Sequence, residues 1–165
     1  MVRYYTHYWA NRTCKDFAVM GLDGEVLNHT AGNLFRKTGI KPADIIYVVT
    51  VIKGQLFIVG KLEVKLICNQ NEAGKLLKCE PSDLWEAEEH VIASKTIKMK
   101  FNRGIPSNVT ENLEFVSGGK SSKPPKFKYP GHLDQQTLRG VRELTSSSAL
   151  LLDEKYPELK KLTPV

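Results

Sequence analysis

Two apolar runs on either side of a Lys53-Gly54 turn form the clearest pattern in the sequence. Residues 45–52 are mostly β-branched, and residues 55–67 continue in the same manner after the turn. Two such runs joined by a glycine-containing two-residue turn predict an antiparallel β-hairpin. From Gly60 onward apolar and charged positions alternate, which predicts a strand with one exposed face that curls at the glycine.

The rest of the pattern predicts short elements in a non-alternating order. We expect strands over 4–9, 90–93, 96–101 and 113–115, a short helix ending at Gly39, a helical turn over 82–89, and loops or turns over 41–44, 69–74 and 102–106. Strands that outnumber helices without regular alternation favour an α+β fold, a curled and mostly antiparallel sheet or a small β-barrel with peripheral helices. The 165 residues have the length of a single domain, 1–165.

The last third of the chain combines a basic loop with a helical segment. Glycine, serine and proline concentrate at about 117–128, a composition typical of a flexible loop. Residues 134–153 are then expected to be helical. Asp134 is the expected N-cap of a first helix over 133–144, because Leu138, Val141 and Leu144 share one helical face. A further turn of helix is expected over 145–153.

Hydropathy and cysteine content exclude several classes of protein. The longest apolar run, 45–52, is far shorter than the roughly 20 residues that span a bilayer. The first residues resemble a strand and lack the basic and apolar regions of a secretory signal, so we expect a cytoplasmic protein. Three cysteines without a C-x-x-C spacing indicate neither a disulfide framework nor a zinc site.

Positive charge is concentrated in one segment. The net charge is +6, and residues 95–128 hold eight Lys or Arg residues against Glu111 and Glu114 alone. Such an excess suits a polyanionic partner, although a lysine-rich surface that only interacts with water has the same composition. The residues expected to contact phosphates are Lys98, Lys100, Arg103, Lys120, Lys123, Lys126 and Lys128.

No catalytic motif is present in the sequence. The four histidines are far apart, and no nucleophile elbow, zinc-protease helix or P-loop occurs. Glu86 and His90 have a spacing that suits two metal ligands on a helix, but a site needs a third ligand. We therefore expect neither a metal nor a cofactor, and a non-enzymatic protein is the simpler interpretation.

Aromatic residues suggest a binding site for a flat ring. Tyr4, Tyr5, Tyr8 and Trp9 crowd the first strand, and Trp85 lies in a polar, acidic segment where a core residue is not expected. Aromatic side chains that stack on nucleic-acid bases contribute about 1–3 kcal/mol each. The alternative is that these residues belong to the core.

The order of these features resembles the PUA-like superfamily, and within it the EVE and YTH-like domains. The resemblance rests on Tyr8-Trp9, on the turn Gly39-Ile-Lys-Pro-Ala-Asp44 and on the hairpin over 45–67, and it covers about the first 95 residues. The family's usual Pro-Gly-Asp is Pro-Ala-Asp here. Such domains bind RNA or DNA and often hold a flipped base in an aromatic pocket. The resemblance implies a base pocket whose residues, with the polar candidates nearby, are Trp9, Asn11, Thr13, Asn33, Tyr47 and Trp85.

The leading hypothesis is therefore a reader of a modified base in nucleic acid, in prokaryotic defence or in an RNA modification pathway. Two alternatives stay open. One is a protein-interaction or regulatory module whose aromatic residues are all in the core. The other is an enzyme on the same scaffold that acts on a nucleotide or RNA, for which His90 and Asp44 are the candidate residues.

Overall fold

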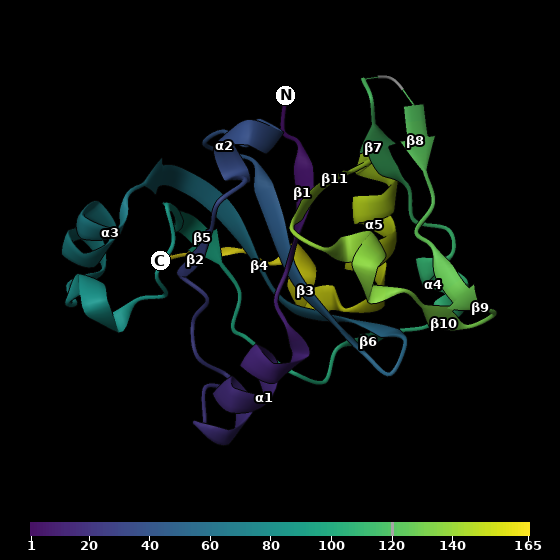
Figure 1. Ribbon diagram of the computed structural model, residues 1–165, viewed down its shortest axis with the longest axis horizontal. Coiled ribbons are helices and arrows are strands. Elements are labelled where there is room, and N and C mark those ends of the chain that lie inside the picture. Colours follow the sequence, from purple (N-terminus) through teal and green to yellow (C-terminus); the bar gives the residue numbers. More distant parts are fainter. Residues whose placement is uncertain (120) are drawn as a thin grey trace.

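The computed structural model describes residues 1–119 and 121–165 (Figure 1). Its strands are β1 (Tyr4–Tyr8), β2 (His29–Gly32), β3 (Ile45–Ile52), β4 (Gln55–Cys68), β5 (Glu89–Thr96), β6 (Gly104–Ile105), β7 (Phe115–Ser117), β8 (Ser121–Lys123), β9 (Phe127–Tyr129), β10 (His132–Leu133), β11 (Val141–Leu144) and β12 (Thr163–Pro164). The helices are α1 (Asn11–Val19), α2 (Phe35–Thr38), α3 (Gln70–Leu77), α4 (Ser107–Thr110) and α5 (Ser146–Lys155), and the 3₁₀ turns are η1 (Pro81–Asp83), η2 (Gln135–Leu138) and η3 (Pro157–Lys160). Among the described residues, no helix has both the length and the apolar character needed to cross a membrane.

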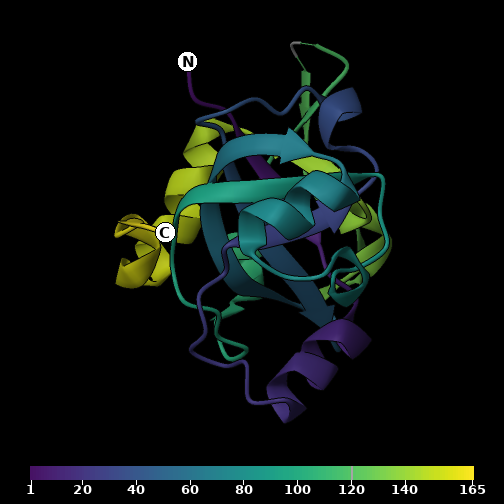
Figure 2. The ribbon, with the colours of Figure 1, turned by 90° about the vertical axis from the view of Figure 1, so that its left-hand side faces the viewer.

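One large mixed sheet organises the fold. Its strands follow the order β12-β5-β4-β3-β1-β11-β7-β8, with β2 beside β5 and β6 beside β4. Only β1 and β3 run parallel among the described pairs of this sheet, so the predicted α+β class with a mostly antiparallel sheet is confirmed. Figure 2 shows how strongly the strands curve. Within the described residues β12 and β8 stand at the two ends of this order and do not pair with each other, so the sheet does not close into the small barrel that was the alternative.

The expected hairpin is β3–β4, and it bends where the glycine was expected to allow it. The pairing of the two strands shifts between Val48 and Val49, opposite Gly60, which is the signature of a β-bulge. A Cβ atom at Gly60 would lie 2.5 Å from Leu27 Cδ2. Glycine therefore lets the segment before β2 pack closely on the curled strand.

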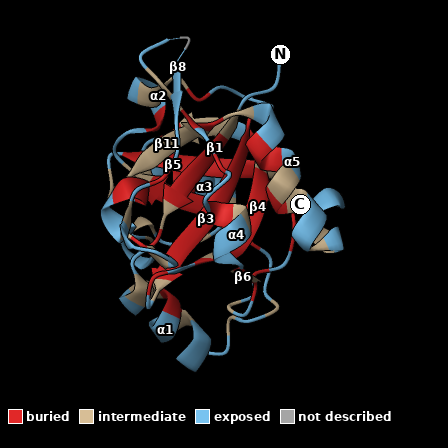
Figure 3. Cartoon of the chain, turned by 90° about the vertical axis from the view of Figure 1, so that its right-hand side faces the viewer, coloured by how far each residue is buried: buried red, intermediate tan, exposed pale blue. Residues whose placement is uncertain are grey.

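Both faces of β3 are buried, which divides the core into two clusters. Ile45, Tyr47 and Val49 pack in a cluster that includes residues of α5 and β11, whereas Ile46 and Val48 pack in a second cluster with residues of α1 and β5. Figure 3 shows the central strands buried and much of the surrounding helical surface exposed. Successive side chains of a strand point to opposite faces, so neighbouring residues of β3 serve different cores.

The prediction of a helix over 133–144 is wrong. Residues 135–138 form only the turn η2, which Asp134 caps as expected, and Val141–Leu144 form β11 between β1 and β7. Gly140, with a φ of +77°, separates the two elements, and this left-handed conformation ends a helix. The helix expected over 145–153 is confirmed as α5, so the segment 134–153 is continuously helical only in its second half.

Three helices occur where none was expected, namely α1, α3 and the single turn α4. α1 follows β1 directly and buries Cys14 in the second cluster, with Phe17 packed against it. α3 replaces most of the loop expected over 69–74. Its N-cap is Asn69, whose side chain accepts a hydrogen bond from the Glu72 N–H. Asparagine is common both in loops and at helix N-caps, so composition alone did not separate the two.

The strand expected over 96–101 is also wrong, because β5 ends at Thr96. The Met99 N–H donates to the Glu25 carbonyl, and the Lys100 N–H donates to the Val59 carbonyl. This segment thus bonds to two different parts of the chain instead of pairing along one strand. The helical turn expected over 82–89 is reduced to η1.

In the described part of the basic segment over 117–128, short strands occur where a loop was expected. β7 and β8 pair in register from Phe115 with Lys123 to Ser117 with Ser121. Phe127–Tyr129 then forms β9, which pairs with β10. Lys120 lies outside the described residues.

Candidate functional site

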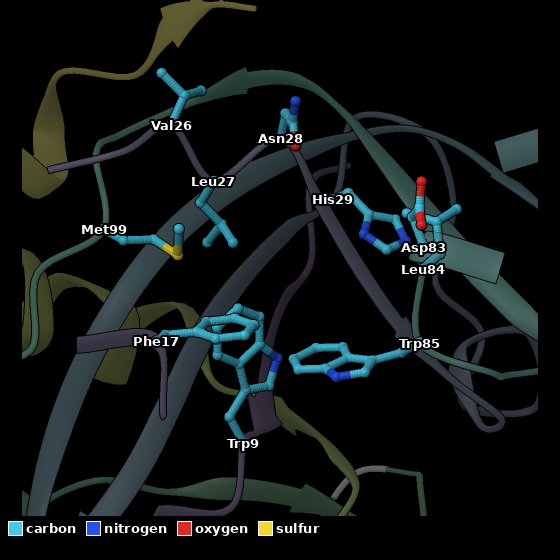
Figure 4. A pocket seen from close by; sticks show the side chains of 10 residues that line it. All are labelled: Trp9, Phe17, Val26, Leu27, Asn28, His29, Asp83, Leu84, Trp85 and Met99. Atoms are coloured by element: carbon cyan, nitrogen blue, oxygen red, sulfur yellow. The ribbon is translucent and has the colours of Figure 1, made fainter. Parts of the chain in front are cut away.

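A cavity of about 240 Å³ opens between α1, the segment before β2 and the segment after η1 (Figure 4). Its lining residues are Trp9, Phe17, Val26, Leu27, Asn28, His29, Asp83, Leu84, Trp85 and Met99. Hollows of about 370 to 470 Å³ lie elsewhere, but among the described residues none is lined by more than one aromatic side chain. Sites for small molecules commonly measure about 300–1,000 Å³, so the aromatic cavity suits a single ring system.

Trp9 forms a rigid wall of the cavity. Its backbone N–H donates to the Val49 carbonyl at 2.8 Å, which anchors the residue to β3. Its indole Nε1–H donates to Thr30 Oγ1 at 3.0 Å. Only 5% of the residue is exposed. With both N–H groups paired and the ring packed, Trp9 has no freedom to turn away from the cavity.

Trp85 is the exposed aromatic residue of the site, with 39% of its surface accessible. Its ring meets that of Trp9 edge to face, with centroids 5.1 Å apart and planes at 88°. Phe17 of α1 stacks on Trp85 with centroids 5.3 Å apart and planes 8° apart, and lies perpendicular to Trp9. These distances are those of favourable aromatic pairs. The three rings therefore form an aromatic corner of defined geometry.

Gln70 on α3 holds the loop that carries Trp85. Its Nε2 donates to the Pro81 carbonyl at 2.9 Å, and its Oε1 accepts from the Ala87 N–H at 3.1 Å. One amide group thus ties both sides of the tryptophan to the same helix. Trp85 is positioned by this clamp although it belongs to no strand or helix.

Leu27 and Met99 form an apolar wall that Figure 4 shows across the cavity from Trp9. Both are buried, with 2% and 6% of their surfaces exposed. Leu27 takes its place because Gly60 has no side chain to obstruct it. The curl of β4 therefore shapes the cavity as well as the sheet.

His29 brings an imidazole to the cavity. Its Nε2 lies 2.7 Å from His90 Nδ1, and the two ring planes differ by only 11°. Burial, reinforced by the neighbouring imidazole of His90, lowers the pKa of His29 to about 4. Burial also lowers the pKa of His90. Both rings are therefore uncharged near neutral pH.

A second histidine lies behind Trp9. His7 Nδ1 is 2.8 Å from Thr30 Oγ1, the same oxygen that accepts from the Trp9 indole. A hydroxyl can accept one hydrogen bond and donate another, so Thr30 can accept from the indole and donate to an unprotonated His7 Nδ1. Burial lowers the pKa of His7 to about 4, which agrees with a neutral ring that accepts.

The structure brings together only two of the residues predicted for the base pocket, Trp9 and Trp85. Tyr47 is fully buried in the other core cluster, where its hydroxyl donates to Asp153 at 2.8 Å. Its placement in the pocket is wrong, because odd-numbered residues of β3 face away from Trp9.

The three polar candidates also lie outside the cavity lining. Asn11 and Thr13 stand in the first turn of α1, a helix that the sequence analysis did not anticipate. Asn33 is exposed, and its Oδ1 accepts from the Glu88 N–H at 3.0 Å. The side chains of all three stand on neighbouring segments instead of in the cavity wall.

The predicted phosphate-binding residues do not form one group. Lys98 and Lys100 are exposed on either side of the lining residue Met99. Lys123, Lys126 and Lys128 are exposed around β8 and β9, at the right of Figure 1, whereas α1 and α3 lie toward the bottom and left. Lys120 falls outside the described residues.

Arg103 is not available for phosphate contact, so this prediction is wrong. The residue is 2% exposed and donates to the carbonyls of Val59 and Lys98 and to Glu158 Oε1. The guanidinium holds β4, the segment after β5 and the C-terminal turn together. The sequence predicts a surface position for Arg103 because its neighbours are basic. The partners that bury it are distant in the chain.

The two candidate catalytic residues, Asp44 and His90, make contacts that stabilise the fold. Asp44 accepts hydrogen bonds from the N–H groups of Arg3 and Lys41, which closes the turn before β3. His90 is completely buried and is linked to the cavity through His29. In the described part of the chain, no three His, Cys, Asp or Glu side chains gather closely enough to hold a metal ion.

Several lining residues were not anticipated from the sequence. Cys14, Phe17 and Ala18 have helical spacing before Gly21, a weak signal for α1 and for the position of Phe17. Nothing in the pattern distinguishes His29, whose partner His90 comes from a distant segment, or Asp83, which reaches the cavity through the packing of the loop after α3. Comparison with protein-family models, with curated proteins and with solved structures gave no match for this chain.

Proposed function

We propose that this chain is a PUA-like nucleic-acid-binding domain that holds a single flipped, modified base in the cavity of Trp9, Phe17 and Trp85. The observation that carries the proposal is the convergence of Trp9 and Trp85 on one small cavity from distant parts of the sequence. Extruding a base costs a few kcal/mol, and stacking on aromatic side chains offsets that cost.

The chemistry of the lining supports a ring as the occupant. Apolar and aromatic side chains dominate, Asp83 is the one charged residue among those that line the cavity, and no lysine or arginine is among them. A phosphate would find no cation there. Lys98 and Lys100 flank the lining residue Met99 and are exposed, and this supports the proposal that they contact the backbone phosphates of a bound strand.

Intrinsic fluorescence offers a direct test, because both tryptophans of the chain lie at the cavity. We expect oligonucleotides with a methylated base to change the fluorescence saturably and with higher affinity than their unmethylated counterparts. DNA and RNA should be compared at low salt, where non-specific phosphate contacts are strongest. Failure of every oligonucleotide under those conditions would overturn the proposal and leave the alternative of a protein-interaction module.

A peptide carrying trimethyl-lysine should be included in the titration. Three aromatic rings beside a carboxylate also resemble the cages that hold quaternary ammonium groups. Binding of that peptide in the absence of oligonucleotide binding would contradict a base reader. Both ligands therefore belong in one experiment.

A further inference from the structure

The cavity offers one ring nitrogen that is rigidly held and has no partner. His29 Nε2 is engaged by His90, whereas His29 Nδ1 has no hydrogen-bond partner among the described residues. Figure 4 shows the imidazole edge turned toward the space between Leu27, Phe17 and Trp85. A fixed polar atom in a site lined mostly by apolar side chains is a usual source of ligand orientation and specificity.

The β2–β5 pairing accounts for the position of this imidazole. In that register His29 lies opposite Ile92, and His90 lies opposite Ala31, so the two histidines are diagonal neighbours on adjacent strands. Diagonal neighbours are within reach of long or aromatic side chains. His90 is fully buried and cannot swing away, so it holds the His29 ring at the cavity edge.

We infer that His29 Nδ1 makes the specificity-determining hydrogen bond to the edge of an uncharged heteroaromatic ring stacked on Trp85, and that His90 is its positioning residue. The inference rests on the proposed function and names the group that distinguishes one base from another. A single proton lies between His29 Nε2 and His90 Nδ1. If the proton is on His29 Nε2, His29 Nδ1 is unprotonated and accepts a hydrogen bond; if it is on His90 Nδ1, His29 Nδ1 carries a proton and donates. The hydrogen bond with His90 therefore controls whether the nitrogen that faces the ligand is a donor or an acceptor.

The electrostatics of the cavity agree with an uncharged ring. Burial lowers the pKa of His29 to about 4, so the imidazole brings no positive charge to the site near neutral pH. Asp83 is the sole charged lining residue. An anionic group inside the cavity would therefore meet a carboxylate and no cation, whereas a neutral ring needs only stacking and one hydrogen bond.

The test is a fluorescence titration with free nucleosides, namely adenosine, cytidine, guanosine, uridine and their base-methylated forms. The quantity measured is the ratio of affinities between the tightest and the weakest ligand. We expect at least about a tenfold ratio for the wild type, the size that one hydrogen bond to a base edge supplies. In His29→Phe the ratio should fall below about threefold, while the affinity of the weakest ligand is retained because stacking is unchanged.

Further variants separate this role from a structural one. His29→Asn places a polar group near the position of Nδ1 and should restore part of the ratio. His90→Asn should retain more of the ratio than His90→Leu, although both change the same buried position. His132→Phe, the same substitution as in His29→Phe but in β10 and outside the cavity lining, should leave the ratio unchanged. Thermal unfolding of each variant establishes that it is folded.

The outcomes distinguish the two proposals. A ratio that persists in His29→Phe and His29→Asn, or a uniform loss of affinity for every ligand, would overturn the role of His29 and leave the base reader intact. Absence of saturable binding of any nucleoside or oligonucleotide to the wild type would overturn both.

Discussion

Trp9 and Trp85 meet edge to face at 5.1 Å, yet they differ greatly in exposure, with 5% and 39% of their surfaces accessible. The contact therefore joins a core residue to a surface residue. This difference assigns two roles, packing in the core and contact with a ligand, to different residues. Trp9 packs in the core and is expected to stabilise the fold, whereas the exposed ring of Trp85 is the surface on which the proposed ligand would stack.

Replacement of Trp85 by alanine should weaken ring binding and leave stability largely unchanged. Stacking of a base on an aromatic ring corresponds to about 1–3 kcal/mol, so we expect nucleoside affinity to fall about 5- to 150-fold. Trp9 fluorescence reports binding in this variant. Trp85→Phe should recover most of the affinity. Tyr129→Ala removes an aromatic residue with 60% exposure outside the cavity lining and should change nothing; an equal loss in that control would contradict the site.

Replacement of Trp9 by alanine should instead destabilise the protein. Large-to-small substitutions of buried tryptophan cost about 3–5 kcal/mol, and here the Thr30 hydroxyl also loses its donor. Trp9→Phe keeps most of the packing and should cost less. Urea unfolding followed by circular dichroism gives both free energies. If Trp9→Ala were as stable as the wild type, the ring would not be the rigid wall described above.

Stability should fall as the pH is lowered from about 6.5 toward 4. The pKa values of His7 and His29 are lowered to about 4 by burial, whereas in the unfolded chain histidine titrates near about 6.5. Between pH 4 and 6.5 these histidines are protonated in the unfolded state but not in the folded state, so lowering the pH favours unfolding. Each histidine contributes about 1.4 kcal/mol per pH unit over this range. Burial also lowers the pKa of His90, which adds to the same slope. Urea unfolding at pH 7, 6 and 5 measures the slope, and His7→Gln should reduce it without removing it; a flat profile would contradict the burial of the histidine rings.

The hairpin and its bend were predictable because they depend on neighbouring residues. β3 is buried on both faces, so its sequence is a continuous apolar run, and Gly60 marks the one position where a side chain would obstruct Leu27. The presence of both tryptophans at one site was predicted from the resemblance, and the cavity contains both. Which face of β3 meets that cavity depends on sheet packing, and this is why Tyr47 was misplaced.

The buried charges were not predictable from local pattern. Lys61 alternates with apolar residues like a surface lysine, but its ammonium contacts Asp153 and the Leu159 carbonyl, which follow it by almost 100 residues. Arg103 is likewise buried, and it donates to Glu158, a residue 55 positions further along the chain. The His29–His90 pair also depends on the register of two strands from distant segments. Long-range partners of this kind leave no periodic signal in the sequence.

The Lys61–Asp153 pair should be important for the stability of the C-terminal helix. Lys61 Nζ lies 3.0 Å from Asp153 Oδ1, and the two side chains are only 7% and 13% exposed. Removing one partner of a buried pair costs about 3–5 kcal/mol because the remaining charge is unpaired. We expect Asp153→Asn to show such a loss in urea unfolding. Lys95→Ala is the matched control. It breaks the pair between Lys95 and Glu63, in which the lysine side chain is 49% exposed, and such a pair contributes less than about 1 kcal/mol.

The exposed lysines of β8 and β9 should affect strand binding without affecting ring binding. Lys123, Lys126 and Lys128 do not line the cavity, so a triple substitution to glutamine should leave nucleoside affinity unchanged. If they contact phosphates, each lost contact should reduce the slope of log affinity against log salt by about 0.7 for a single strand or about 0.9 for duplex DNA. Oligonucleotide titrations at several salt concentrations measure this slope.

The control for that experiment must change the net charge equally. Lys155, Lys160 and Lys161 are exposed near the C-terminus, and their triple substitution to glutamine removes the same charge from a different surface. If the lysines of β8 and β9 contact phosphates directly, the slope of log affinity against log salt should fall only for the β8–β9 variant. Direct contact releases counterions, whereas distant charge is largely screened. Equal effects of both variants would mean that the lysines of 117–128 only raise the general charge of the protein. The base would then be read in the cavity with phosphate contacts supplied from elsewhere, with Lys98 and Lys100 the next residues to replace.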